Sequence, residues 1–184
     1  VPSHPLAKAW AERGLTELRR QLFSWSDEDG GWLETPHYAM VALDHMIGAF
    51  LMAKNAGFGD YLHEERIRKV CEWLAKISTP RDRRTGGFRH YPPIGNTYMG
   101  EGTSMFGIIA GLWKERDPAF ASQMQWMCDE HGSPPIGLFG PFGTFSGYKA
   151  MLKAHGVVSK APQYGSEWFR NTGVVLRNTI GSER

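Results

Sequence analysis

Two polar loops, at residues 29–38 and 81–98, contain the side chains whose types and spacing could do chemistry. Each loop precedes an apolar segment that is expected to form a helix, so both would lie at one rim of a helical fold. His37 in the first loop and Tyr91 in the second are 54 positions apart. We interpret His37 as a candidate for binding an anion and Tyr91 as a candidate for moving a proton.

His37 is expected in the first turn of a helix that begins at Thr35-Pro36, because threonine caps helices and proline suits their first position. Free backbone N–H groups and the helix dipole favour an anion there, and a donating imidazole adds to this preference. The structural alternative is a histidine that only caps the helix or hydrogen-bonds at its rim. Glu34 would either orient His37 or be a charge before the helix.

Tyr91 would need help to act as a base, because the ordinary pKa of tyrosine is near 10. A run of cationic side chains precedes it and would favour the tyrosinate as well as attract a polyanion. These side chains are Arg81, Arg83, Arg84, Arg89 and His90. The alternatives are a tyrosine that packs against its loop and an arginine run that forms a solvated loop tip.

Three stretches of sequence resemble the heparinase II/III-like polysaccharide lyases. Residues 29–38, which read DGGWLETPHY, look like the family's DGxxxExPxY stretch. Residues 91–97, YPPIGNT, look like the later PPxGD stretch of its helical domain, with Asn96 where aspartate is usual. Residues 166–177, SEWFRNTGVVLR, are similar to the opening of its β-sandwich domain. The three occur in the family's order, so the resemblance covers about residues 27–177.

The resemblance implies β-elimination at a uronate. A base removes the proton α to the sugar carboxylate, the leaving oxygen receives a proton, and the carboxylate must be neutralised most strongly in the transition state. In the family an asparagine or histidine of the first loop neutralises the carboxylate, and a tyrosine of the later loop is the base or acid. His37 and Tyr91 take these roles by resemblance. The substrate-binding residues that we predict are Trp32, Glu34, Tyr38, Arg84, Arg89, His90, Asn96 and Tyr98.

The resemblance also implies an acidic polysaccharide as the partner and a bacterial protein that is periplasmic or secreted. No cofactor is expected in this chain, although a metal site could lie in a β-domain beyond it. Two other functions stay open. A glycoside hydrolase on a six-hairpin toroid would need a pair of carboxylic acids, for which Glu34 and Glu101 are the candidates. A non-catalytic glycan-binding module would need neither.

Composition excludes several other classes. The chain is 41% hydrophobic and has a net charge of +2, which suits a globular protein and is too small for a typical nucleic-acid binder. Uninterrupted apolar runs stay well short of a membrane span. Cys71 and Cys128 belong to no CxxC pair, so we expect two buried thiols instead of a disulfide framework or zinc ribbon.

Hydrophobic periodicity predicts a mainly helical fold. Amphipathic segments alternate with segments that are apolar on nearly every side, as outer and inner helices of an (α/α) toroid would. The expected helices lie at about residues 6–22, 35–56, 64–77, 103–114, 117–131 and 145–154. The stripe of the first helix is Leu6, Trp10, Leu15, Leu18 and Leu22. Gly30-Gly31-Trp32 and Gly86-Gly87-Phe88, which are 56 positions apart, indicate a weak two-helix repeat.

Two domains are expected. Residues 1–156 would be part of the toroid, which is incomplete with about three helical hairpins, and residues 157–184 would be a linker and the start of a β-sandwich. The apolar run at residues 173–177 is typical of a strand. No second strand is predicted in the chain, and a lone strand is not stable. We therefore expect the strand to pair elsewhere and the chain to be a fragment of a larger enzyme.

Overall fold

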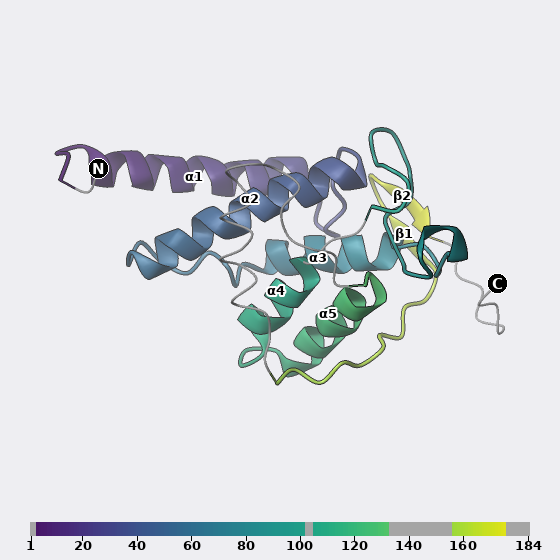
Figure 1. Cartoon of the computed structure of the whole chain (residues 1–184). Coiled ribbons are helices and arrows are strands. Elements are labelled where there is room, and N and C mark those ends of the chain that lie inside the picture. The colour runs from purple at the N-terminus through teal and green to yellow at the C-terminus, as the bar shows by residue number, and fades with distance from the viewer. Residues whose placement is uncertain (1–2, 102–104, 133–155, 176–184) are drawn as a thin grey trace.

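The computed structural model describes residues 3–101, 105–132 and 156–175, and in this part the chain is mainly helical. Five α-helices are followed by one small two-stranded sheet (Figure 1). The mainly helical fold class is therefore confirmed. The helix expected at residues 145–154 lies outside the described residues.

α1 (Ala7–Trp25) is an amphipathic surface helix whose apolar stripe is only partly buried. Leu15 and Leu22 are buried, but Leu6 and Trp10 are 52% and 57% exposed. The reason is geometric, since the N-terminal end of α1 projects past the other described helices (Figure 1). The apolar stripe of this helix is therefore buried only beyond its first turns.

α2 (Pro36–Asn55) is the central helix of the described structure. It contacts α1 on one side and α3 (Glu65–Ile77) on another, which explains why its apolar residues are distributed nearly all round. Buried side chains such as Leu43, Ile47 and Phe50 have no exposed surface. α3 instead buries a single face, with Ile67, Val70 and Leu74 inside.

α4 (Met105–Trp113) and α5 (Pro118–Glu130) form a helical hairpin. α4 is short and almost wholly buried, from Met105 to Ala110. α5 begins after Asp117, whose carboxylate accepts a hydrogen bond from the backbone N–H of Phe120 at 3.0 Å. A long loop that contains one 3-10 turn, η1 (Arg83–Thr85), connects α3 to α4. This loop carries most of the predicted site residues.

The C-terminal strand has a partner within the chain, so the prediction of a lone strand is wrong. β1 (Glu167–Phe169) and β2 (Gly173–Val175) are antiparallel, with Glu167 opposite Val175 and Phe169 opposite Gly173. Phe169 is buried, and Oε2 of Glu167 forms an ion pair with Nζ of Lys76 in α3 at 2.8 Å. The hairpin is therefore attached to the helical part at α3.

Three further features concern the whole described structure. Cys71 and Cys128 are both buried and form no disulfide, as expected. Among the described residues there is no helix with the length and apolar character that crossing a membrane requires. The described residues also contain no group of three or more histidine, cysteine, aspartate or glutamate side chains that could hold a metal ion.

Candidate functional site

The two loops singled out in the sequence meet at the start of α2. His37 lies in the first turn of this helix, and its Nδ1 is 2.6 Å from Oε1 of Glu101, which is 64 positions away. The side chains of His37 and Glu101 are only 12% and 10% exposed. The backbone N–H of His37 donates to the Thr97 hydroxyl at 3.1 Å. Thr97 therefore caps α2 from the second loop, and the His37 N–H is not open to an anion.

Two tyrosines flank the His37 imidazole. The rings of Tyr38 and Tyr98 lie edge-on to it, with centroids 5.2 Å and 5.4 Å away. Both are accessible, at 42% and 68% exposed, so they form the rim around a nearly covered histidine. The Asn96 amide donates to the Tyr38 hydroxyl at 3.3 Å. The structure thus brings together four predicted residues, His37, Tyr38, Asn96 and Tyr98.

Glu101 connects this cluster to the loop that carries it. Its Oε2 accepts a hydrogen bond from the backbone N–H of Tyr98 at 3.2 Å, while Oε1 is next to His37. Its backbone carbonyl accepts from the backbone N–H of Tyr91 at 2.8 Å. Glu101 was considered above only as a hydrolase carboxylate, and Thr97 only as part of a motif. Their partners in α2 are 60 or more positions away, so sequence spacing gives no sign of these contacts.

Tyr91 does not join the accessible rim. Its side chain has no exposed surface, and its ring packs edge-on against His131 at a centroid distance of 5.4 Å. Burial raises the pKa of Tyr91 well above its usual value, and unfavourable electrostatic interactions with Cys71 and Glu101 add to the effect. The expectation that nearby arginines favour the tyrosinate is therefore wrong. A hydroxyl without solvent access cannot meet a polymer in this conformation, so Tyr98 is the better-placed tyrosine.

Three of the arginines before Tyr91 form ion pairs with nearby carboxylates. Arg84 forms a two-point contact with Asp82, and this hydrogen bonding lowers the pKa of Asp82 to about 2. Arg81 and Arg89 share the carboxylate of Glu130, and the hydrogen bond from Arg81 is the largest cause of its lowered pKa. The predicted polyanion-binding roles of Arg84 and Arg89 would have to compete with these carboxylates.

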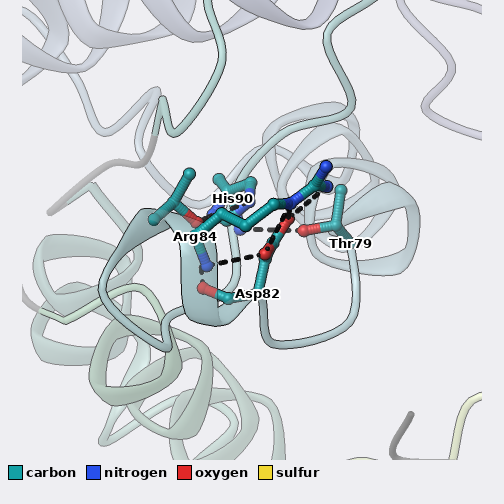
Figure 2. A network of polar contacts seen from close by, with 5 residues as sticks. Thr79, Asp82, Arg84 and His90 are labelled. Atoms are coloured by element: carbon teal, nitrogen blue, oxygen red, sulfur yellow. Dashed lines mark hydrogen bonds and ion pairs between the residues drawn. The ribbon is translucent and has the colours of Figure 1, made fainter.

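His90, also predicted to bind substrate, lies inside the loop. His90 is 5% exposed, and its backbone N–H donates to the Thr79 hydroxyl at 3.2 Å (Figure 2). Its ring is also within hydrogen-bond distance of the Thr85 hydroxyl. Figure 2 shows Asp82 and Arg84 beside His90. The network closes the loop around η1. His90 therefore has an evident structural role.

A groove of about 590 Å³ lies between the start of α2, α3 and the β-hairpin. Glu34, Pro36 and Ile94 line it together with Phe169 of β1. Pro36, which lines the groove, is the residue immediately before His37 in the sequence. Trp32 also lines the groove but is only 3% exposed, so it packs the loop instead of offering an open stacking face.

Comparisons of the chain with protein-family models, with curated proteins and with solved structures found no match. The resemblance to heparinase II/III-like lyases therefore rests on the three stretches of sequence alone.

Proposed function

We propose that the chain belongs to a polysaccharide lyase that cleaves a uronate-containing acidic glycan by β-elimination. The observation that carries the proposal is a nearly covered imidazole, His37, held by a carboxylate and flanked by the exposed hydroxyl-bearing ring of Tyr98. A group that binds a carboxylate and a group that moves a proton are the two that β-elimination requires. The family resemblance supports an (α/α) toroid followed by a β-sandwich as the fold of the whole enzyme.

In the proposed reaction, protonated His37 donates a hydrogen bond to the uronate carboxylate and stabilises the charge that develops on it. Tyr98, as the phenolate, accepts the proton from the carbon α to that carboxylate. The electrons of the broken C–H bond form the new C=C bond, and the glycosidic C–O bond breaks. The leaving oxygen then takes the proton from Tyr98, which restores the phenolate. Tyr98 replaces Tyr91 in this role because it is 68% exposed and Tyr91 is buried.

The geometry favours this reaction over glycoside hydrolysis. A hydrolase needs one carboxylic acid free to protonate the leaving oxygen and a second carboxylate across the bond. Both oxygens of Glu101 already have partners, His37 and the backbone of Tyr98. This arrangement suits a carboxylate that orients a histidine. By the same resemblance, we propose that the protein is periplasmic or secreted and that its partner is an acidic polysaccharide.

Product analysis tests the proposal. The protein is incubated with heparan-like and alginate-like polymers, and unsaturated uronate ends are followed by their ultraviolet absorbance. Tyr98→Phe should lower the rate of elimination by about 10²- to 10⁴-fold, the usual contribution of a general acid–base group. Tyr91→Phe is the matched control and should stay within a few fold of the wild type. New reducing ends without ultraviolet absorbance would instead identify a hydrolase, and binding without cleavage a glycan-binding module.

A further inference from the structure

The contact between His37 and Glu101 determines which imidazole nitrogen carries a proton. Nδ1 of His37 and Oε1 of Glu101 are 2.6 Å apart, so one proton must lie between them. In a contact of this kind the ring nitrogen is the donor and the carboxylate oxygen the acceptor, which places the proton on the histidine. The second oxygen of Glu101 accepts from the backbone N–H of Tyr98, which is consistent with an ionised carboxylate that only accepts.

We infer that Glu101 is a positioning residue that keeps the proton of His37 on Nδ1 and leaves Nε2 for the substrate. Neutral His37 then presents a lone pair at Nε2, and charged His37 presents an N–H donor there. A neutral histidine that donates from Nε2 is disfavoured, because it would bring two lone pairs together at Glu101. The orientation of the ring is fixed at the same time, since the rings of Tyr38 and Tyr98 lie against it.

Glu101 also fixes the position of His37 relative to Tyr98. Its carboxylate contacts the His37 ring and the backbone of Tyr98, so the two proposed reacting groups share one anchor. Removal of the carboxylate should therefore disturb both groups, whereas removal of the Thr97 hydroxyl loosens only the attachment of the loop to α2. Thr97→Val is thus a matched control for loop loosening.

The tautomer can be measured directly by ¹⁵N–¹H correlation spectra of the histidine rings. In the wild type at a pH where His37 is neutral, Nδ1 should carry the proton. Thr97→Val should keep this form, and Glu101→Ala should shift His37 to the Nε2–H form. Glu101→Gln, which preserves the shape of the side chain, should give a mixture, because an amide can donate or accept. A wild-type ring protonated on Nε2, or an unchanged Nδ1–H form in Glu101→Ala, would overturn the inference.

The kinetic consequence rests on the proposed lyase function, whereas the tautomer does not. If the protein cleaves a glycan, Glu101→Ala should lower kcat by up to about 10⁴-fold, the scale for the histidine-orienting carboxylate of a catalytic triad. KM should change less, because the exposed rings of Tyr38 and Tyr98 remain. A kcat within a few fold of the wild type would contradict the positioning role. If no glycan is cleaved, the proposed function fails, and the spectra still decide the inference about Glu101.

Discussion

Arg89 and Glu130 are joined twice. The backbone N–H of Arg89 donates to the backbone carbonyl of Glu130 at 2.8 Å, and Nε of Arg89 donates to its Oε2 at 2.9 Å. Glu130 is the last residue of α5, where a negative charge is unfavourable to the helix dipole. The guanidinium groups of Arg89 and Arg81 offset that charge. The loop that carries the candidate site is therefore attached to the end of α5.

Glu130→Ala should lower the free energy of unfolding by about 3 kcal/mol, because it leaves the guanidinium of Arg89, which is 17% exposed, without its carboxylate. Urea denaturation measures this difference. Glu115→Ala is the control, since that side chain is 90% exposed, and it should change stability by less than about 0.5 kcal/mol. Equal effects of the two substitutions would contradict a structural role for the Glu130 pairs.

Stability should fall as the pH is lowered from about 6.5 toward 3, and His131 is one cause. Burial lowers the pKa of His131 from 6.5 to about 3, with the charges of His90 and Arg89 adding to the effect. In this window the unfolded chain binds a proton that the folded chain does not, so acid favours unfolding. Urea denaturation at several pH values should show a weaker pH dependence for His131→Gln.

Ser78→Ala separates that titration from a loss of packing. The Ser78 hydroxyl is 3.0 Å from Nε2 of His131 and donates to the backbone carbonyl of Leu74. Its removal should lower stability at every pH but keep the dependence between pH 6.5 and 4.5. Below about pH 4.5 carboxylates such as Glu130 also contribute, because their lowered pKa makes protonation destabilising. A pH dependence in His131→Gln equal to that of the wild type would rule out His131 as a source.

Gly30→Ala should be much more destabilising than Gly57→Ala. Both glycines have a positive φ, +89° and +78°, which costs an alanine about 1–2 kcal/mol. A Cβ at Gly30 would lie 2.2 Å from the backbone oxygen of Lys69 in α3, whereas a Cβ at Gly57 has nothing within 4 Å. The clash should add about 1–3 kcal/mol, measurable by urea denaturation. Similar losses at both positions would mean that the loop can shift away from α3.

Tyr91→Phe should raise the free energy of unfolding by about 1 kcal/mol. The Tyr91 hydroxyl is buried and has no hydrogen-bond partner in the described structure, and the desolvation of such a group is unfavourable. Tyr98→Phe, at a side chain that is 68% exposed, should be neutral within about 0.5 kcal/mol. Thermal and urea unfolding of the two variants compare them. A clear destabilisation by Tyr91→Phe would show that this hydroxyl has a partner after all.

Local sequence patterns predicted where the helices begin and end better than they predicted how the helices pack against one another. Thr35-Pro36 indicated the start of α2, which begins at Pro36 and ends at Asn55, close to the expected residue 56. Trp10 fits the apolar stripe of the first helix but is 57% exposed, because periodicity does not show where a neighbouring helix ends. β1 was missed because three residues, Glu167–Phe169, are too short to show alternation.

The candidate site shows the same limit. The helix-start motif was sufficient to predict the place of His37, whereas its partner Glu101 depends on how a loop 64 positions away folds back. Tyr91 precedes two prolines in a polar loop, which is typical of an exposed residue. Its backbone hydrogen bond to Glu101 and its ring contact with His131 instead accompany a fully buried side chain. Long-range contacts of this kind leave no local signature in the sequence.

The attachment of residues 94–101 has a consequence for local opening of the protein. This loop is bound to α2 through the polar side chains of Thr97 and Glu101, while Ile94 and Met99 are 61% and 71% exposed. Little buried apolar surface stabilises the loop against α2. We therefore expect the free energy of detaching the loop to be well below the free energy of global unfolding. The amide of His37 should then exchange its hydrogen with solvent far faster than the amides of Leu43 and Ile47. A preparation with a full helical signal can therefore have lost the arrangement of its candidate site.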